Sequence, residues 1–594
     1  MCLRQCAVFP CLFSVYFLGS CSSCFLVFFF DLPFLCTPSV FSWIFVKIKT
    51  QAQYFACHLC NWVQPSPPPL TISFSFPESI ATPPGDSTGL NFIVVFPENI
   101  ADYHPEAPQN KVRITAMNDN TQVTIQYFND KPGGPDTLRK GETRLYPVNA
   151  NMDLWKTGFS NKTLKINSKK TITVQAINCK KNSAQTALVI PTDQLGNEYF
   201  IPPIPNIQGT TVPSDIVTTG VTERNPFKLI IVNTDKVNKV TVGNNQTFIL
   251  QPFQLNQVWV QDKTLRTVKA DNAVAVLFGH TCAMKDNCTC GQLYATLPPA
   301  NDVKLKFYIP PILANNVEDN AFVLLSERGS TRVQAFNKDL QMVEAAGTAI
   351  FYRPGLLLTL IPETDFASCY VVNAIPDTPS FALIVVNKSL TDGVHNGGLS
   401  LQNPVWQELK GTEYVSTLVA VGSQSVIWHD SSEMAVYFLG KKKTALFGNP
   451  APIISKTPDF RGCVLSPEVM KIADVSDGWR ESLKYCKDKG LELVSFPKAQ
   501  LQRHIYEKIL QLKNDTVQEV WIGMRRSSRS GEWYWLNQQP VNDTNWDEGE
   551  PGTVFDGQCV VMSLEKGKDF GWSGKDCCKP AYSICYKEPV LFWG

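Results

Sequence analysis

Five carboxylates crowd one short stretch near the C-terminal end of the 594-residue sequence. They are Asp543, Asp547, Glu548, Glu550 and Asp556. Ca²⁺ takes six to eight oxygen ligands, and carboxylate oxygens are among those it prefers. One interpretation of this stretch is therefore a cation site. The other, which we favour, is a solvated acidic loop.

The segments around this acidic loop are rich in tryptophan, glycine and cysteine. They include Trp-Ile-Gly-Met at 521–524, Gly-Glu-Trp-Tyr-Trp at 531–535 and Trp-Ser-Gly-Lys-Asp-Cys at 572–577. A region with few long apolar runs is poorly stabilised by core burial alone, so we expect disulfide bonds and an oxidising compartment. We expect Trp533, Trp535 and Trp546 to be mainly core residues, because each ring buries a large area.

These runs, with Cys486 upstream and the Glu550-Pro551 dipeptide before Cys559, make residues 460–588 resemble a C-type lectin-like domain. The resemblance implies an α+β fold in which two helices precede strands and long loops. It also implies two disulfide bonds and leaves two cysteines that could pair with each other. The implied pairs are Cys486–Cys585 and Cys559–Cys577, and the remaining pair is Cys463–Cys578. The neighbouring cysteines 577 and 578 leave the choice of partner for Cys559 open.

Two helices are expected at the start of this domain. Asp477 is a candidate cap for a helix that carries Trp479, Leu483 and Cys486 on one face and ends at Gly490. A second helix is expected after Pro497. Its apolar face would consist of Leu501, Ile505, Ile509 and Leu512.

The calcium site of the resembled family is incomplete in this sequence. Calcium-dependent members carry Glu-Pro-Asn or Gln-Pro-Asp, then an acidic residue before the third core cysteine, then Trp-Asn-Asp. Here Glu550 is kept, Gly552 replaces the amide, and Ser573 and Gly574 replace the last two ligands. The residues before Cys559 are Gly557 and Gln558. Glycine has no side-chain oxygen, so we predict a degenerate site, no cofactor, and calcium disfavoured.

Ligand contact in this domain is therefore expected from the acidic loop and one of its tryptophans. The candidate ligand-binding residues are Glu550, Asp547, Glu548, Asp556 and Trp546. Without calcium, the expected ligand is a protein or a glycan. The alternative is a calcium-dependent carbohydrate-binding receptor at the cell surface.

Residues 89–450 form a succession of short strands with no useful helical period. The strand at 112–117, the turn Asn118-Asp119-Asn120 and the strand at 121–125 predict a hairpin. A matching hairpin is predicted at 232–242, and the later run Tyr-Phe-Ile-Pro-Pro-Ile at 199–204 recurs as Phe-Tyr-Ile-Pro-Pro-Ile at 307–312. These repeats predict two or three antiparallel β-sandwich-like modules in series, the third at about 321–447.

The run Phe-Ile-Val-Val-Phe-Pro-Glu-Asn at 92–99, the turn at 116–121 and Leu-Pro-Pro at 297–299 resemble the N-terminal domain of the IgG Fc-binding protein family. The resemblance covers about residues 89–447. It implies a secreted binding role, with glycan, glycoprotein, immunoglobulin or mucus proteins as partners. The expected fold class is thus mainly β and multidomain: tandem antiparallel β-sandwich-like modules followed by an α+β C-type lectin-like domain.

Five cysteines lie in the β region: Cys179, Cys282, Cys288, Cys290 and Cys369. His280 stands near three of them, so a metal site is one interpretation. Disulfide bonds are the favoured one, with one thiol left over because five is odd. Their pairing does not follow from the sequence.

The N-terminal part is of another kind. Residues 1–62 are apolar and rich in Cys and Phe, and we interpret them as a signal, an anchor or a segment that is not authentic mature sequence. Residues 7–30 are long and apolar enough to span a bilayer, and membrane attachment depends on them. Residues 63–88 and 451–459 contain several prolines and are predicted linkers. Cys57-x-x-Cys60 lacks a βαβ context for a redox role.

The overall charge is nearly balanced, with 54 basic and 53 acidic residues and a net charge of +1. This gives no electrostatic case for binding nucleic acid. Six Asn-x-Ser/Thr sequons fit a glycoprotein that is secreted or at the cell surface. They begin at Asn161, Asn245, Asn287, Asn387, Asn514 and Asn542.

No motif indicates catalysis. The sequence contains six histidines and no Gly-x-Ser-x-Gly elbow, His-Glu-x-x-His helix or phosphate loop. We therefore expect an extracellular recognition protein rather than an enzyme.

Overall fold

The computed structural model describes residues 15–18, 25–28 and 87–593, with gaps at 100–106, 129, 131, 181–182, 205–226, 244–245, 261–265, 285–289, 315–320, 337–338, 354, 443–444, 513–516, 554 and 566. The sequons at Asn245, Asn287 and Asn514, Cys57, Cys60 and Cys288, the side chains of Cys282 and Cys290, and most of residues 1–88 lie outside the described part. The chain divides into two units, Met1–Ile80 and Ala81–Gly594. In the first, β1 (Val15–Leu18) pairs antiparallel with β2 (Phe25–Phe28).

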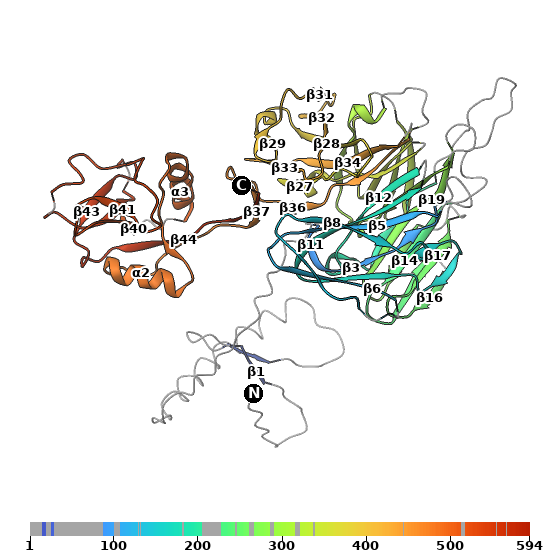
Figure 1. Ribbon diagram of the computed structural model, residues 1–594, viewed down its shortest axis with the longest axis horizontal. Helices are drawn as coiled ribbons and strands as arrows, with labels where there is room; N and C mark the ends of the chain where they lie inside the picture. The colour runs from blue at the N-terminus through green and yellow to red at the C-terminus, as the bar shows by residue number, and fades with distance from the viewer. Residues whose placement is uncertain are drawn as a thin grey trace, which may run out of the picture. The chain divides into compact units, whose positions relative to one another are not determined.

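The second unit is mostly β structure, as the sequence predicts, and its β strands up to residue 450 fall into four consecutive groups (Figure 1). The first β group (89–189) consists of β3 (Gly89–Val94), β4 (Phe96–Pro97), β5 (Gln109–Ala116), β6 (Thr121–Tyr127), β7 (Asp136–Leu138), β8 (Thr143–Val148), β9 (Asp153–Leu154), β10 (Gly158–Ser160), β11 (Leu164–Lys180) and β12 (Ser183–Val189). The second β group (198–296) consists of β13 (Glu198–Phe200), β14 (Lys228–Asn233), β15 (Asn238–Val242), β16 (Gln246–Leu250), β17 (Leu255–Trp259), β18 (Thr267–Ala270), β19 (Val274–Met284) and β20 (Cys290–Thr296).

The other two groups follow directly. The third β group (305–359) consists of β21 (Leu305–Tyr308), β22 (Phe322–Glu327), β23 (Ser330–Ala335), β24 (Met342–Ala345), β25 (Gly347–Arg353) and β26 (Leu356–Thr359). The fourth β group (369–450) consists of β27 (Cys369–Val371), β28 (Ser380–Asn387), β29 (Val394–Asn396), β30 (Leu399–Ser400), β31 (Gln407–Glu408), β32 (Tyr414–Ala420), β33 (Val426–His429), β34 (Ala435–Lys442) and β35 (Ala445–Pro450). The predicted module at 321–447 spans strands of both. Within the predicted linker 451–459, β36 (Ile453–Ser455) pairs with β27.

The second and fourth β groups share one sheet topology. The sheets β13-β18-β15-β16 and β17-β14-β19-β20 have the same strand order as β27-β33-β29-β30 and β32-β28-β34-β35. The edge strands differ, because β17 pairs with β10 of the first β group and β32 pairs with β31 of its own group. Both groups also hold a buried tyrosine in the same way. The hydroxyl of Tyr199 accepts from Gly196 N and donates to Val274 O, and that of Tyr370 accepts from Ala367 N and donates to Met434 O.

The last strands of the four β groups meet one another. β12 lies against β20 and β35, and β26 lies against the same two strands. Side chains join them, since Thr296 Oγ1 donates to Leu188 O at 2.8 Å and Thr359 Oγ1 donates to Thr296 O at 3.2 Å. The four groups are therefore joined through these strands. The predicted arrangement of modules in series does not by itself imply these contacts.

The two predicted hairpins are wrong. β5 and β6 both pair with β11 and not with each other, and β14 and β15 belong to different sheets. The turn residues reverse the chain as expected, but β5 and β6 lie on either side of β11 in one sheet, and the connection from β14 to β15 crosses to another sheet. In the second turn the side-chain amide of Asn233 donates to Lys236 O and Gln251 O. A side chain, rather than a backbone N–H of a hairpin, therefore bonds to these carbonyl groups.

The C-terminal domain contains both helices. Its elements are β37 (Cys463–Ser466), β38 (Val469–Ile472), α2 (Trp479–Asp488), β39 (Glu492–Leu493), α3 (Ala499–Leu512), β40 (Glu519–Arg526), β41 (Trp533–Trp535), β42 (Cys559–Ser563), β43 (Trp572–Lys575), β44 (Tyr582–Lys587) and β45 (Val590–Trp593). The central sheet has the order β38-β44-β40-β42-β43. Figure 1 shows α2 and α3 on opposite sides of β40 and β44.

The predicted helix faces are largely confirmed. Trp479 and Cys486 of α2 and Ile505 and Ile509 of α3 are buried. Two details differ. The N-cap of α2 is Gly478 without a side-chain cap, because the Asp477 carboxylate accepts from Gly478 N instead. Leu512, in the last turn of α3, is exposed.

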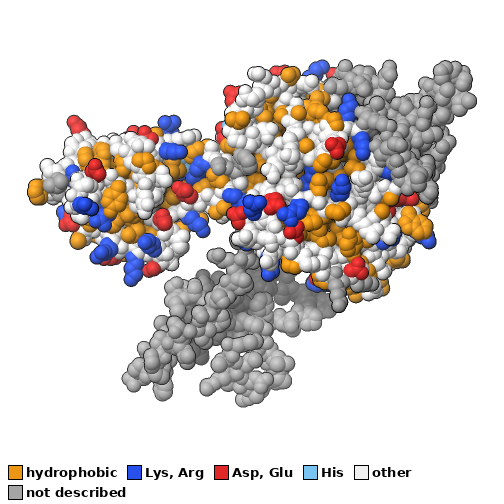
Figure 2. All heavy atoms as spheres, in the orientation of Figure 1, with side chains coloured by type: hydrophobic (Ala, Val, Ile, Leu, Met, Phe, Trp, Pro, Cys, Tyr) orange, Lys and Arg blue, Asp and Glu red, His pale blue; other side chains and the backbone are white. Residues whose placement is uncertain are grey.

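Among the described residues no helix has the length and apolar character needed to cross a membrane. Figure 2 shows basic, acidic and apolar side chains interspersed over the visible face. This distribution agrees with the nearly balanced net charge.

Candidate functional site

The candidate site lies on the long loop between β41 and β42, residues 536–558. A cluster of packed tryptophan rings lies beneath this loop. The ring centroid of Trp546 lies 5.1 Å from that of Trp533 and 5.7 Å from that of Trp572, and Trp535 lies 5.5 Å from Trp572. Trp535 and Trp572 are fully buried. Trp546 packs in this cluster and is half-buried.

Glu550 contacts the backbone at the place where the resembled family has its last calcium ligands. Its Oε2 accepts from Gly574 N at 2.9 Å. Beside it, Ser573 Oγ donates to Asp547 Oδ2 at 3.4 Å. The Glu550-Pro551 peptide bond is cis. Two of the predicted ligand-binding carboxylates are thus brought beside Ser573 and Gly574, and each already has a hydrogen-bond donor.

Gly552 and Asp556 form a closed turn next to this point. Asp556 Oδ2 accepts from the backbone nitrogen and the hydroxyl of Thr553, at 2.6 and 2.7 Å. These bonds, aided by the charge of Arg526, hold the pKa of the Asp556 carboxyl below its usual value. Gly552 has φ +65°, and a Cβ there would lie 2.9 Å from Asp556 Oδ2. The missing amide side chain at position 552 is therefore explained by the conformation of the turn.

The remaining acids of the loop are directed elsewhere. Asp543 Oδ2 accepts from Ala499 N at 2.9 Å, at the first residue of α3. Glu548 is exposed. Within the described ranges, no group of three or more His, Cys, Asp or Glu side chains is placed to hold a metal ion. Asp547 and Glu550 thus lie beside the same strand, whereas Asp543 and Asp556 are engaged elsewhere.

Two further residues near this loop were not predicted from the sequence as ligand-contact residues. Phe555, at the tip of the 553–556 turn, is 93% exposed. Arg526 lies on β40, with its guanidinium 5.2 Å from the Trp533 ring centroid and its Nε donating to Gly531 O. A phenylalanine in sequence is most simply a core residue, and only the fold shows that this one faces solvent. Glu550, Asp556, Phe555, Arg526 and Trp533 are called the long-loop surface below.

The disulfide bonds brace the domain. The structure joins Cys486 to Cys585 and Cys559 to Cys577. It joins Cys463 to Cys369 of β27, and Cys578 is an exposed free thiol. The predicted Cys463–Cys578 pair is therefore wrong. Cys463 lies in a buried apolar cluster with Cys369 and Phe592, whereas Cys578 lies in an exposed turn.

The other predicted site residues are glycosylation sites, a cysteine and a histidine. Asn161 and Asn542 are exposed and Asn387 is half-buried. Cys179 is a half-buried free thiol, and burial raises its pKa. His280 is buried, with its ring 5.2 Å from that of Phe227.

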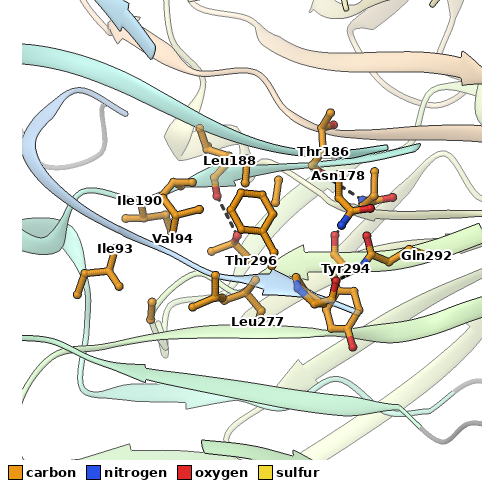
Figure 3. Close-up of a pocket in the computed structure, with 18 residues that line it drawn as sticks. Ile93, Val94, Asn178, Thr186, Leu188, Ile190, Leu277, Gln292, Tyr294 and Thr296 are labelled. Carbon is orange, nitrogen blue, oxygen red and sulfur yellow. Dashed lines mark hydrogen bonds between the residues drawn. The ribbon is translucent and has the colours of Figure 1, made fainter. Parts of the chain in front are cut away.

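A cavity of about 40 Å³ lies between β3, β12 and β20 (Figure 3). Leu188, Leu277 and Tyr294 are among its lining residues, and the bond from Thr296 to Leu188 crosses it. This volume holds a water molecule or two and is far below the several hundred Å³ of a small-molecule site. The long-loop surface is therefore the better candidate for ligand contact.

Two family models match parts of this chain. The model described as Lectin C-type domain matches residues 475–587, and the model described as IgGFc binding protein matches residues 185–354. Both resemblances stated from the sequence are thereby confirmed. The two models belong to binding proteins rather than to enzymes.

Curated relatives match the same two regions. The human IgGFc-binding protein is 24% identical over 374 residues, which are 57% of this chain and 7% of that protein. The human C-type mannose receptor 2 is 29% identical over 111 residues, which are 19% of this chain and 7% of the receptor. The chain thus spans only a small part of the length of either relative.

Solved structures similar to this chain include human lithostathine, which is 20% identical, with 20% of this chain and 92% of that chain covered and a TM-score of 0.19. The C-type lectin domain of murine dendritic cell inhibitory receptor 2, in complex with N-glycan, is 26% identical. That match covers 20% of this chain and 91% of that chain, with a TM-score of 0.18.

Proposed function

We propose that this chain is an extracellular recognition protein whose C-terminal lectin-like domain binds a glycan or a protein without calcium. The observation that carries the proposal is the bond from Gly574 N to the Glu550 carboxylate. The one side chain kept from the calcium-ligand set already accepts a backbone hydrogen bond. Glycine at 552 and 574 supplies no oxygen to replace it.

The long-loop surface offers what a ligand would need in the absence of a metal ion. Glu550 and Asp556 have carboxylate oxygens that can accept from hydroxyl or amide groups. Arg526 supplies guanidinium donors, and Phe555 and Trp533 supply apolar area. A few such anchors commonly carry most of the binding energy of an interface.

The three disulfide bonds among the described residues support the extracellular location, because such bonds persist in oxidising compartments. The β region would present the lectin-like domain and add binding surface of its own. Immunoglobulin Fc and mucus glycoproteins are the protein ligands to test first, because the matched family model and the human relative carry the name IgGFc binding.

Calorimetric titration of Ca²⁺ into the whole chain, with disulfides intact, tests the calcium part. We expect no heat and no shift of the melting temperature. The matched variant carries Gly552→Asn, Ser573→Asn and Gly574→Asp, which restores the ligand types of the family. Asn tolerates the positive φ at 552, although Asp556 has to move. Stoichiometric binding by the unmodified chain would contradict the proposal.

Glycan-array binding with and without chelator tests the ligand part. Binding that survives the chelator and falls at least tenfold in Phe555→Ala and Arg526→Ala supports the proposal, since interface anchors often contribute 2 kcal/mol or about 30-fold. Binding that the chelator abolishes favours the calcium-dependent receptor instead. Glu492→Ala is the control, because this exposed acid lies on β39 and is not among the candidate ligand-binding residues.

A further inference from the structure

One of the six sequons differs from the others in its neighbourhood. Phe159 stands two residues before Asn161 in the run Phe-Ser-Asn-Lys-Thr at 159–163. No other sequon has an aromatic residue at that place. The residues there are Gly243, Lys285, Val385, Leu512 and Pro540.

The fold puts Phe159 and Asn161 on the same side of an edge strand. β10 pairs antiparallel with β17, with Phe159 opposite Asn256 and Ser160 opposite Leu255. The next pair in this register is Asn161 with Gln254, and the Gln254 amide donates to Asn161 Oδ1 at 3.3 Å. The ladder itself ends at Ser160, and the bond between the two side chains places Asn161 on the side of Gln254. Asn256, opposite Phe159, and Gln254 are two residues apart, and side chains at that spacing in an extended chain leave on one face.

The Phe159 ring is held in place and still open to solvent. It packs edge-on against Phe248, with ring centroids 5.8 Å apart and an interplanar angle of 86°. It nevertheless remains 57% exposed. Asn161 is exposed beside it, and its bond to Gln254 uses the oxygen and leaves Nδ2, the atom that carries a glycan.

We propose that Asn161 carries an N-linked glycan whose first N-acetylglucosamine packs against the Phe159 ring. The pyranose presents C–H groups on its faces, and these are attracted to the negative face of an aromatic ring. The packing would also remove exposed apolar area from water. The glycan attached to Asn161 would thus cover the exposed ring of Phe159.

The chemistry is ordinary glycan transfer in the secretory pathway. Asn161 Nδ2 forms a bond to C1 of the sugar, the bond from C1 to the lipid diphosphate donor breaks, and Nδ2 loses one proton. In the folded chain Thr163 is buried and its hydroxyl donates to Phe253 O at 2.8 Å. Transfer would therefore precede folding of this strand. The inference rests on the extracellular location in the proposed function and not on the ligand of the long-loop surface.

The test uses the full chain secreted by eukaryotic cells that keep high-mannose glycans, trimmed enzymatically to one N-acetylglucosamine per site. Glycopeptide mass spectrometry should show Asn161 occupied. Hydrogen exchange in β10 and β17 should be about two- to tenfold faster in Asn161→Gln, the range for one aromatic contact. In the Phe159→Ala and Phe159→Leu backgrounds the same substitution should have no effect. Asn387→Gln, at a sequon without the aromatic residue, is the control for loss of a glycan.

Three outcomes would overturn the inference. If Asn161 carries no glycan while Asn387 or Asn542 does, the inference is refuted, and the extracellular location still stands. Asn161 can be glycosylated while Asn161→Gln changes hydrogen exchange equally with and without Phe159. That result refutes the packing of the sugar against the ring. A chain that is not secreted and carries no glycan at any site refutes both this inference and the extracellular part of the proposed function.

Discussion

The Glu550 carboxylate lies 2.9 Å from the backbone nitrogen of Gly574 and accepts its hydrogen bond. The bond ties the loop after Trp546 to β43. It uses a side chain that a calcium-dependent domain would direct at the metal. The loop conformation is thus held by contacts internal to the protein, and these can be altered one at a time.

Glu550→Ala should loosen this loop. Removing the acceptor leaves Gly574 N without its partner, which should cost about 1–2 kcal/mol of local stability. Glu550→Gln keeps an acceptor oxygen and should cost less. Hydrogen exchange at the Gly574 amide is the measurement, with Glu548→Ala as the exposed control. Unchanged exchange in Glu550→Ala would contradict the role assigned to this bond.

Glu468 should make the lectin-like domain sensitive to acid. Its side chain is 3% exposed and bonds to Arg461, His504 and Tyr586 at 2.6–2.8 Å, and it pairs with Lys508. Burial alone would raise the pKa of Glu468, but the hydrogen bonds from these four side chains outweigh it and lower the pKa to about 2.

A carboxyl with a lowered pKa stabilises the fold above its unfolded pKa of 4.5 and loses that contribution as pH falls toward about 2. The melting temperature of the domain should therefore fall across this window. Glu468→Gln should flatten the fall and cost about 1–3 kcal/mol near neutral pH, because Lys508 and His504 lose their anion while Arg461 keeps Asp459. Glu492→Gln, an exposed acid on β39, is the control. An unchanged acid transition in Glu468→Gln would refute this assignment.

Two free thiols in the described part of the chain, Cys179 and Cys578, should differ in reactivity. Cys578 is exposed and should react with iodoacetamide in the folded, unreduced chain. Cys179 should react slowly, because burial raises its pKa and the thiolate is the reactive form. Peptide mapping of these two sites gives the result, and Cys578→Ser should remove the faster label. Faster labelling of Cys179 than of Cys578 would contradict the prediction.

Cys463→Ser should act on the fold rather than on surface chemistry. It opens a bond that spans 94 residues and should cost about 2–4 kcal/mol. It should also release the Cys369 thiol, which denaturing alkylation detects. Cys578→Ser should leave the melting temperature within about 1 °C, as a change at an exposed site. Equal effects of the two substitutions would count against the Cys369–Cys463 pairing.

The sequence predicted most of what depends on local pattern. The apolar spacing in Trp479–Asp488 and Ala499–Leu512 places both helices, and glycine at 552 and 574 marks the loss of side-chain oxygens. The two helix predictions held because the apolar period is a property of a few neighbouring residues, whereas the loss of calcium binding inferred from the two glycines stays a prediction.

The rest depends on partners that sequence spacing does not specify. Asn118-Asp119-Asn120 reverses the chain, but whether β5 then pairs with β6 or with β11 is decided by long-range packing. Cys463 finds Cys369 because an apolar cluster brings β27 and β37 together. Asp543 caps α3 while Glu550 bonds to β43, so carboxylates seven residues apart serve different elements.

The paired tyrosines of the second and fourth β groups give a last prediction. Tyr199 and Tyr370 are fully buried, and each hydroxyl makes two backbone hydrogen bonds. Tyr199→Phe and Tyr370→Phe should each cost about 1–3 kcal/mol, because two buried hydrogen bonds are lost, although Ala367 N keeps its bond to Met434 O.

Tyr294→Phe is the matched control. The Tyr294 hydroxyl is buried without a hydrogen-bond partner among the residues that the structure describes, so its removal should be neutral or stabilising. The urea midpoint and hydrogen exchange of the β region report each effect. A loss for Tyr294→Phe as large as for Tyr199→Phe would show that ring packing, rather than the two backbone bonds, determines the cost. If the losses differ as expected, the same tyrosine contact stabilises two β groups whose strands share one topology.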